Sequence, residues 1–397
     1  MALTQIETPS SDVARRISIL GATGSIGKST ADLIRRNRDR FDVVALTANK
    51  SAAELAALAR EFDAELAVVA DPSAYDALRE GLAGSGIEAA AGPDALSAAG
   101  GVSADLIVAG IVGAAGLDST LSAVGQGTLV ALANKESLVC AGDLVLAATE
   151  RSGTRLLPLD SEHNAIFQVF ETENAGDVEK LILTASGGPF RTWSRERMAA
   201  ATPDEAIAHP NWDMGRKISV DSATMMNKGL ELIEAAYLFP VGVDDIDVLV
   251  HPQSVVHSMV AYVDGSVLAQ MGTPDMRVPI AHALAWPARM ESPAARLDLA
   301  AIGSLEFEEP DHERFPSIAL ARSALSAGRG ATVVLNAANE VAVESFLDGR
   351  IGFLEIAETV MRVLDKVDGH EIASLEDFRS LDRESRHVSE NLVKSAS

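Results

Sequence analysis

Residues 17–27, with the sequence ISILGATGSIG, indicate how the first part of this chain folds. The apolar run Ile17–Leu20 predicts a buried strand, and Gly21, Gly24 and Gly27 lead from it into a helix-like stretch. Glycines at this spacing permit a tight turn, a close approach of the backbone to a pyrophosphate, and close packing of helix on strand. A glycine triplet also occurs in purely structural turns, but the strand–loop–helix context favours a dinucleotide-binding loop.

Short apolar runs and helix-like stretches continue to alternate after this loop. Strands that are apolar on both faces and alternate with helices are typical of a parallel sheet covered on both sides. We therefore predict an α/β chain whose first domain, residues 1–160, is doubly wound. Its further strands are predicted at 43–47, 66–69, 106–108, 129–132 and 156–159, and its helices at 26–38, 52–61, 73–82, 117–124 and 137–149.

The pattern changes after residue 160. Residues 161–296 predict an α+β domain, with strands at 180–183, 246–250, 255–263 and 267–271 among loops rich in Gly, Pro, Asn and Trp. Residues 297–316 predict a linker with an acidic stretch. Residues 317–397 predict a C-terminal helical bundle, with helices at 318–327, 333–347, 353–367 and 375–393.

Composition excludes several classes of partner. The 397 residues include 33 Lys and Arg against 57 Asp and Glu, a net charge of −24, which disfavours nucleic acid and anionic membrane surfaces. The single cysteine, Cys140, excludes an internal disulfide and a Cys-ligated zinc site. The N-terminal residues lack the apolar core of a signal peptide, and the longest apolar run is too short to span a membrane. We predict a cytoplasmic protein.

The end of the second predicted strand indicates which dinucleotide binds. Sites for NAD usually have Asp or Glu there, to bind the ribose 2′-hydroxyl. This chain instead has Asn49, Lys50 and Ser51, without a carboxylate. A lysine can bind the 2′-phosphate, which favours NADPH, although Lys50 could also be an ordinary surface lysine.

Two carboxylates close the last strand of the first domain. In extended chain, Asp160 and Glu162 point to the same side, and such neighbours repel unless a cation lies between them. Oxygen ligands favour Mg²⁺ or Mn²⁺ over zinc. An equally weighted alternative is that one of the two acids caps a following helix. His163 is a rival ligand, but we expect it to be packed in the interior.

Groups that bind phosphate and hydroxyls are concentrated in residues 184–231. Ser186 stands in a Gly-rich turn, and Trp212 and Met214 lie in a loop, either as core residues or as a lid that excludes water. Lys228 and Glu231 lie on one face of a predicted helix.

The two lysines of these segments each have an ordinary interpretation as well. The spacing of Lys228 and Glu231 fits an ion pair on the helix surface. It also fits a site in which Lys228 binds a phosphate and Glu231 binds a metal. Lys135, with Asn134 and Glu136, follows the strand 129–132 at the carboxyl edge of the sheet, where it could also begin a helix without a further role.

Six motifs together resemble the 1-deoxy-D-xylulose 5-phosphate reductoisomerase family. They are GATGSIG (21–27), LANKESLV (132–139), PLDSEHNAIFQ (158–168), SGGPF (186–190), HPNWDMGRKISVDSATMMNKGLELIEA (209–235) and HPQSVVHSM (251–259). The resemblance spans about residues 15–390. It implies a homodimeric oxidoreductase with an NADPH domain, a catalytic domain and a C-terminal bundle. The implied reaction rearranges and reduces 1-deoxy-D-xylulose 5-phosphate to 2-C-methyl-D-erythritol 4-phosphate in non-mevalonate isoprenoid synthesis.

The resemblance also implies site residues, numbered here as in this sequence. It implies that Asp160, Glu162 and Glu231 bind Mg²⁺, Mn²⁺ or Co²⁺ and that Trp212 and Met214 belong to a flap. Lys135, Asp160, Glu162, Glu231 and His209 are the implied catalytic residues. Substrate contacts are implied for Lys135, Ser161, Glu162, Ser186, His209, Ser222, Asn227, Lys228 and Glu231. Cofactor contacts are implied for Thr23, Gly24, Ser25, Ile26, Asn49, Lys50, Ser51, Asn134, Glu136 and Gly215.

Two other functions fit parts of the pattern. A semialdehyde dehydrogenase has a similar Gly-rich loop but needs a nucleophilic cysteine, whereas Cys140 lies in an apolar helical run that predicts a buried thiol. A non-catalytic NADP sensor would be expected to lack some of the carboxylates or lysines named above. A short-chain dehydrogenase is excluded because no tyrosine is followed four residues later by lysine.

Overall fold

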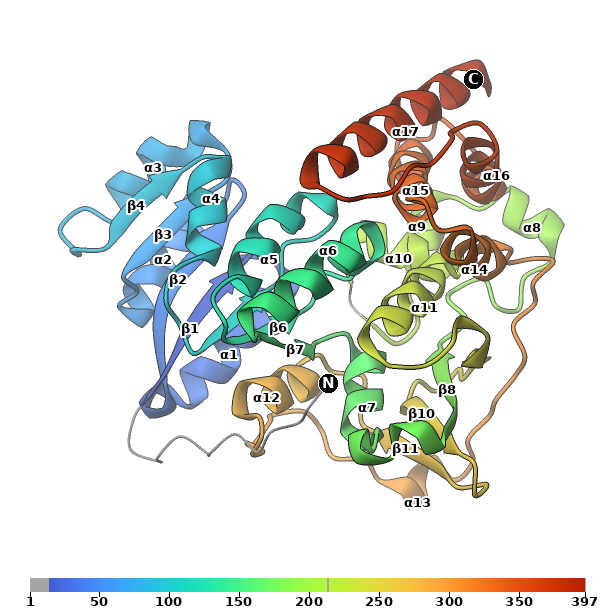
Figure 1. Ribbon diagram of the computed structural model, residues 1–397, viewed down its shortest axis with the longest axis horizontal. Coiled ribbons are helices and arrows are strands. Elements are labelled where there is room, and N and C mark those ends of the chain that lie inside the picture. Colours follow the sequence, from blue (N-terminus) through green and yellow to red (C-terminus); the bar gives the residue numbers. More distant parts are fainter. Residues whose placement is uncertain (1–13, 213, 397) are drawn as a thin grey trace. The chain divides into compact units, whose positions relative to one another are not determined.

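The structure, a computed structural model, describes residues 14–212 and 214–396 (Figure 1). These residues form two compact units. The first contains the described residues up to 137 together with 145–164 and 276–294, and the second contains 138–144, 165–275 and the described residues from 295 onward. The domain boundaries expected from the sequence stay a prediction, and their ends at 1–13 and 397 lie outside the described residues.

A seven-stranded parallel sheet forms the centre of the first unit. Its order is β4-β3-β2-β1-β5-β6-β7, so β1 lies in the middle and the direction of winding reverses between β1 and β5. In such sheets, ligands bind beyond the carboxyl ends of the strands at this reversal. The strands are β1 (Arg15–Leu20), β2 (Phe41–Ala48), β3 (Leu66–Val69), β4 (Glu88–Ala91), β5 (Leu106–Ala109), β6 (Leu129–Leu132) and β7 (Arg155–Pro158).

Helices connect these strands and confirm the predicted doubly wound α/β fold. The prediction missed β4 and the helix α4 that follows it. Three of the four residues of β4 are alanines, which are weak strand formers, and the strand exists through its pairing with β3 at the edge of the sheet. The helices are α1 (Ser25–Arg36), α2 (Ala52–Phe62), α3 (Tyr75–Gly81), α4 (Pro93–Gly100), α5 (Leu117–Val124), α6 (Glu136–Ser152), α7 (Ser161–Val169) and α12 (Arg277–Ala285), with short 3-10 helices at Arg38–Arg40, Pro72–Ala74 and Ala114–Gly116.

The second unit contains a four-stranded mixed sheet of order β11-β10-β8-β9. Strand β10 is antiparallel to β8 and β11, and β9 is parallel to β8. All four strands lie where the sequence predicted strands. Their bounds are β8 (Val178–Ala185), β9 (Ile246–Val250), β10 (Val256–Tyr262) and β11 (Val267–Met271).

The C-terminal helices share one apolar core with this sheet. Leu183 of β8, Phe190 and Phe346 belong to the same buried cluster, and the rings of Phe190 and Phe353 meet edge to face at 4.7 Å. The helices of this part of the chain are α8 (Arg195–Ala199), α9 (Pro203–Ile207), α10 (Arg216–Ala223), α11 (Met226–Leu238), α13 (Leu299–Ile302), α14 (Ser317–Ala327), α15 (Ala331–Leu347), α16 (Phe353–Leu364) and α17 (Leu375–Ala396), with 3-10 helices at Thr172–Asp177 and Val243–Asp245.

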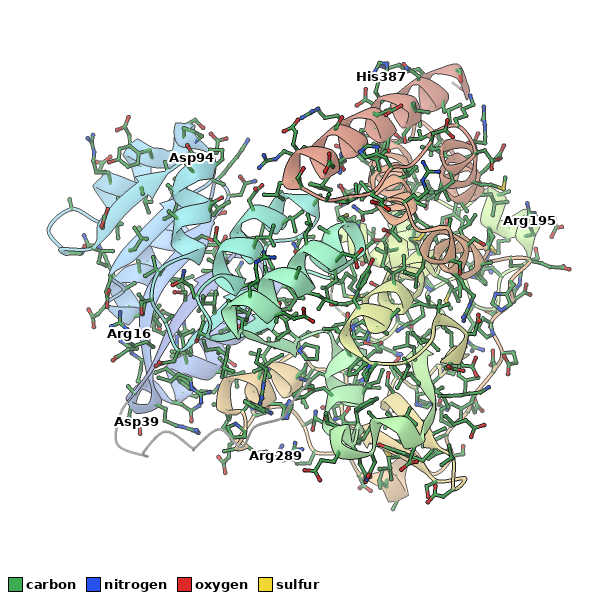
Figure 2. The ribbon with its side chains drawn as sticks, viewed as in Figure 1. Arg16, Asp39, Asp94, Arg195, Arg289 and His387 are labelled. Atoms are coloured by element: carbon green, nitrogen blue, oxygen red, sulfur yellow. The ribbon has the colours of Figure 1, made fainter. Side chains whose placement is uncertain are left out.

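Charged side chains cover the outside of both units. Asp39, Asp94 and Arg195 project outward in Figure 2, and each is exposed. Cys140 is buried, as the apolar run around it predicts. Within the described part of the chain, every helix is too short or too polar to cross a membrane.

Two glycines of the loop after β1 are required by close packing. Gly21 has a φ of +87°, and a Cβ there would lie 2.8 Å from the carbonyl oxygen of Gly110. A Cβ at Gly27 would lie 2.4 Å from the carbonyl oxygen of Gly21. Gly24 differs from both, because the atom closest to a Cβ there would be 3.4 Å away. Gly21 and Gly27 therefore set how closely α1 packs behind the loop.

We predict that Gly27→Ala destabilises the first unit by roughly 1–3 kcal/mol, because the added methyl overlaps backbone atoms that cannot move independently. Gly24→Ala is the matched control and should change stability by less than about 1 kcal/mol. Thermal unfolding of the two variants checks this. Equal melting temperatures would contradict the packing argument.

Candidate active site

The loop after β1 presents backbone amides at the carboxyl end of the sheet. Gly24 is the N-cap of α1 and no side chain caps this helix end, while Gly24 and Ser25 are exposed. The first N–H groups of a helix have no partner within it and carry a partial positive charge, which attracts phosphate. Thr23 and Ile26 are half-buried beside them. The arrangement can bind an anion on a chain whose net charge is strongly negative.

Polar residues also follow β2. Asn49, Lys50 and Ser51 are all exposed, and Ser51 is the N-cap of α2. The Lys50 ammonium lies 3.2 Å from a carboxylate oxygen of Asp71, yet 72% of the lysine side chain remains accessible. Because the Lys50 side chain is not packed in the interior, it can reach a ligand bound at the carboxyl end of β2 without disturbing the core.

The segment after β6 combines a structural residue with a charged one. Asn134 donates from Nδ2 to the carbonyl oxygens of Ile111 and Gly113 and accepts from the backbone N–H of Ser137, so its side chain ties the loops after β5 and β6 together. Glu136 next to it is buried. The Lys135 ammonium donates to Asp160 at 2.6 Å, and both side chains are nearly buried. Lys135 is therefore more than the ordinary start of a helix.

Asp160 caps helix α7. Its Oδ1 accepts from the N–H of Glu162 at 3.2 Å, and Ser161 donates its hydroxyl to the Glu162 carboxylate. The expectation that residues 160–162 are extended was wrong, because α7 begins at Ser161 and Glu162 lies in its first turn. The capping interpretation was correct, and the other oxygen of Asp160 faces Lys135. His163 is fully buried, as expected.

Lys228 and Glu231 form a buried ion pair on α11. Their side chains are 4% and 1% exposed, and Asn227 also donates to the Glu231 carboxylate. The alternative of a surface pair is wrong. Gly229 of the same helix packs closely on α14, where a Cβ would lie 2.8 Å from the Cβ of Ala321.

A tight turn precedes this pair. Met225 has a φ of +62°, and its N–H bonds the carbonyl oxygen of Ser222 while its own carbonyl accepts from Lys228. A Cβ at Gly188 would lie 2.6 Å from the carbonyl oxygen of Ser222, so the Gly-rich turn after Ser186 approaches the end of α10 closely. The fold thus brings the two predicted serines into one part of the second unit.

His209 is oriented by three hydrogen bonds. Its Nδ1 accepts from the N–H groups of Asn211 and Trp212, at 3.1 and 3.0 Å, so its Nε2 carries the proton. Nε2 then donates to the Ser186 hydroxyl at 2.8 Å. Burial lowers the pKa of His209 to about 4. The imidazole is neutral near pH 7 and acts as a hydrogen-bond donor.

The loop that carries Trp212 is tied to the motif at 251–259. Asn211 donates to the carbonyl oxygen of Pro252 and to the Ser254 hydroxyl. Trp212 and Met214 are half-buried, and Gly215 is the exposed N-cap of α10. These residues lie in a loop, as predicted, and their role as a flap stays a prediction.

One site residue was missed by the sequence reasoning. The ring of His257 lies 6.1 Å from that of Trp212, and burial lowers its pKa to about 4, helped by the nearby charge of Lys228. His257 thus faces the same loop and the same lysine as the predicted residues. The motif HPQSVVHSM contained this histidine, but nothing in its spacing indicated which way the side chain points.

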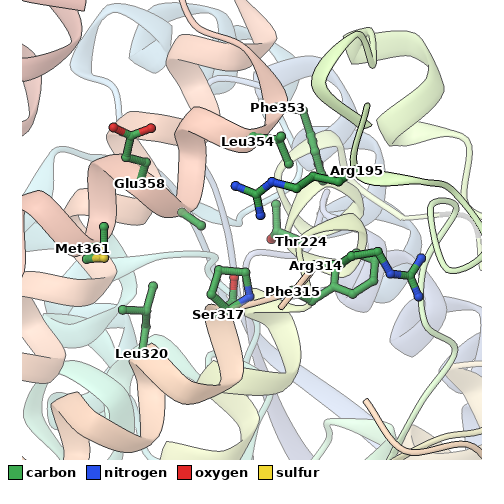
Figure 3. Close-up of a pocket in the computed structure, with 12 residues that line it drawn as sticks. Arg195, Thr224, Arg314, Phe315, Ser317, Leu320, Phe353, Leu354, Glu358 and Met361 are labelled. Carbon is green, nitrogen blue, oxygen red and sulfur yellow. The ribbon is translucent and has the colours of Figure 1, made fainter. Parts of the chain in front are cut away.

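A pocket of about 290 Å³ lies elsewhere in the second unit, between α8, α14 and α16 (Figure 3). Leu320, Phe353, Leu354 and Met361 give it an apolar wall. The predicted site residues do not line it. It is therefore distinct from the candidate active site.

Comparisons with known proteins cover nearly the whole chain. Family models match residues 17–142 (1-deoxy-D-xylulose 5-phosphate reductoisomerase), 156–239 (1-deoxy-D-xylulose 5-phosphate reductoisomerase C-terminal domain) and 271–388 (DXP reductoisomerase C-terminal domain). The 1-deoxy-D-xylulose 5-phosphate reductoisomerase of Zymomonas mobilis is 56% identical over 381 residues, 96% of this chain and 98% of the relative.

Solved structures give the same result. The Zymomonas mobilis enzyme in complex with NADPH superposes with a TM-score of 0.92 at 54% identity, covering 96% of this chain and all of that one. A reductoisomerase in complex with NADPH, fosmidomycin and magnesium superposes with a TM-score of 0.90 at 45% identity, covering 96% of this chain and 98% of that one. The likeness therefore includes both described units.

We predict that acid destabilises the protein partly through His209. Its pKa falls from 6.5 to about 4 on folding, so the unfolded chain binds more protons between these values and stability is lost as pH falls from about 6.5 to 4. His209→Gln should lose less stability across this window than the wild type. Denaturant unfolding at several pH values checks this, with the exposed His387→Gln as control. An unchanged slope in His209→Gln would contradict it.

Proposed function

The chain belongs to the 1-deoxy-D-xylulose 5-phosphate reductoisomerase family, and on that premise we propose which of its residues carry the reaction. The enzyme rearranges and reduces 1-deoxy-D-xylulose 5-phosphate to 2-C-methyl-D-erythritol 4-phosphate, in isoprenoid synthesis, with NADPH and a divalent metal. The semialdehyde dehydrogenase and the NADP sensor are not favoured, because the match extends over both units.

Asp160, Glu162 and Glu231 are the proposed metal ligands. Each offers carboxylate oxygens, the donors that Mg²⁺ and Mn²⁺ prefer. Within its own unit each is held by neighbouring donors, Asp160 by Lys135, Glu162 by Ser161, and Glu231 by Asn227 and Lys228. Such outer contacts orient ligands before the ion binds. When bound, the divalent ion would act as a Lewis acid that polarises the ketone of the substrate and lowers the pKa of its neighbouring hydroxyl.

Ser186, Ser222, Asn227 and Lys228 form the proposed phosphate grip. Support comes from the close approach of Gly188 to Ser222 and from the turn at Met225, which leads directly to Asn227 and Lys228. Ser222 and Asn227 are half-buried, so their polar groups remain within reach of a ligand. Binding energy from a remote phosphate can be used to close Trp212 and Met214 over the reacting carbons.

Lys135, Ser161 and His209 are proposed to contact the oxygens of the reacting carbons. Lys135 is held by Asp160 and would donate to the oxygen on which negative charge develops. His209 is neutral and its Nε2–H bonds Ser186, another proposed substrate residue, so it can exchange this hydrogen bond for one to the substrate without adding charge. Closure over these groups keeps water from the aldehyde formed before hydride transfer.

NADPH is proposed to bind along the carboxyl edge of the first sheet. The exposed amides of the loop after β1 fit its pyrophosphate, and Thr23, Gly24, Ser25 and Ile26 line that loop. Asn49, Lys50 and Ser51 fit the phosphorylated ribose. Asn134, Glu136 and Gly215 are proposed to lie near the nicotinamide end of the cofactor. Asn134 contributes by holding the loops after β5 and β6 together.

We also propose a homodimer paired along β11. This strand is an edge of the second sheet and is mostly exposed, including Val267 and Leu268 at 52% and 39%. The opposite edge, β9, is partly covered by a bridge between Val250 and Glu308. An open apolar edge favours pairing with another copy of the same chain.

We predict that Glu231→Gln and Asp160→Asn each lower kcat/KM by about 10³-fold or more, since each removes a charged metal ligand. Both should bind NADPH as the wild type does. The measurement follows NADPH absorbance with 1-deoxy-D-xylulose 5-phosphate across a Mg²⁺ titration, with and without a chelator. Glu205→Gln, at an exposed helix cap of the same chain, is the control. A variant whose Mg²⁺ requirement matches the wild type would remove that residue from the ligand set.

We predict that Lys50→Gln raises the KM for NADPH by about 10-fold and leaves the KM for NADH unchanged, because only NADPH has the 2′-phosphate. Steady-state kinetics with both cofactors checks this. Lys180→Gln removes another ion-paired lysine, from the second unit, whose side chain is 44% accessible, and should change neither value. An equal rise for both cofactors would show that Lys50 has no role in selectivity.

A further inference from the structure

A buried polar contact links the C-terminal helices to the end of α10. Asn339 of α15 donates from Nδ2 to Oδ1 of Asp221 at 2.7 Å, although the two residues are 118 positions apart. Asp221 is 1% exposed and Asn339 is fully buried. The second oxygen of Asp221 lies 2.9 Å from the Lys217 ammonium, one turn earlier on α10. The carboxylate is thus compensated by one charge from its own helix and one amide from α15.

The buried Asn339 side chain has an energetic cost. Its Oδ1 has no hydrogen-bond partner among the described residues. An apolar side chain at this position would avoid the unpaired oxygen. The hydrogen bond from Asn339 therefore has a positional effect, because it fixes the orientation of the Asp221 carboxylate.

Asp221 immediately precedes Ser222, the first residue of the proposed phosphate grip. The Ser222 carbonyl accepts from the Met225 N–H, and the Asp221 carbonyl accepts from the Thr224 hydroxyl, both at 3.2 Å. These bonds connect the position of Asp221 with the turn that leads to Lys228. On the other side, Glu340 beside Asn339 is bound by Arg386 of α17 at 2.5 Å. The chain of contacts runs from α17 through α15 to α10.

We propose that Asn339 is a positioning residue for the phosphate grip, through its hydrogen bond to Asp221. The inference rests on the proposed function of Ser222 and Lys228, and it gives the C-terminal bundle a role in substrate affinity. Loss of this bond leaves the buried Asp221 carboxylate compensated by Lys217 of its own helix, and the end of α10 shifts. Small displacements of groups that position a substrate have large effects on its binding.

The test compares charge variants at the two positions. Asn339→Asp places two carboxylates together and should raise the KM for 1-deoxy-D-xylulose 5-phosphate by about 10-fold, with the KM for NADPH unchanged and kcat within about threefold. The inhibition constant of inorganic phosphate should rise by the same factor. Asn339→Leu should act in the same direction. The double variant Asp221→Asn with Asn339→Asp restores one amide and one carboxylate and should return the KM to within about threefold of the wild type.

Two controls separate the possible outcomes. Ser345→Ala alters another buried polar residue of α15, whose hydroxyl bonds only within that helix, and should leave the KM unchanged. Ser222→Ala tests the grip itself, and an unchanged KM there would refute the grip as proposed. If Ser222→Ala raises the KM while folded Asn339→Asp and Asn339→Leu do not, Asn339 has no positioning role. If Asn339→Asp does not fold, Asn339→Leu and the double variant decide the question.

Discussion

The structure depends on the way an acidic chain buries lysine beside carboxylate. Lys135 and Asp160 in the first unit, and Lys228 and Glu231 in the second, are pairs that water barely reaches. Breaking a buried pair by removing one partner typically costs about 3–5 kcal/mol, because the other charge is left uncompensated. Each pair therefore fixes the position of a side chain that is proposed to bind the metal or the substrate phosphate. Each pair is neutral as a unit, so a lysine ammonium is held in the interior of a chain of net charge −24 without an uncompensated charge.

Backbone geometry provides the remaining anion-binding capacity. The loop after β1 uses Gly21 and Gly27 to bring α1 close to the sheet, and this leaves amides exposed at the helix start. The turn at Met225 and the Gly-rich turn after Ser186 do the same for polar side chains in the second unit. His209 and His257 add neutral donors and acceptors, since burial keeps their pKa well below neutrality. None of these devices requires a positively charged surface.

The C-terminal helices are part of the unit that carries the proposed phosphate grip. Phe346 and Phe353 belong to the same core as the strand β8, and Asn339 bonds directly to α10. A substitution in these helices can therefore alter the site without touching a ligand. This explains why a helical segment with no chemical motif of its own belongs to the same compact unit as the residues that the motifs predict.

The sequence alone determined the features that repeat locally. Strand and helix periodicity gave the doubly wound fold and the four strands of the second sheet, and the glycine spacing gave the loop after β1, because these patterns reflect contacts within a few residues. Tertiary structure decided the rest. Pairing with β3 makes a strand of the alanine-rich residues 88–91, the tertiary fold buries Lys228 with Glu231, and the fold joins Asp221 to Asn339. Burial and long-range pairing depend on neighbours that no local pattern specifies.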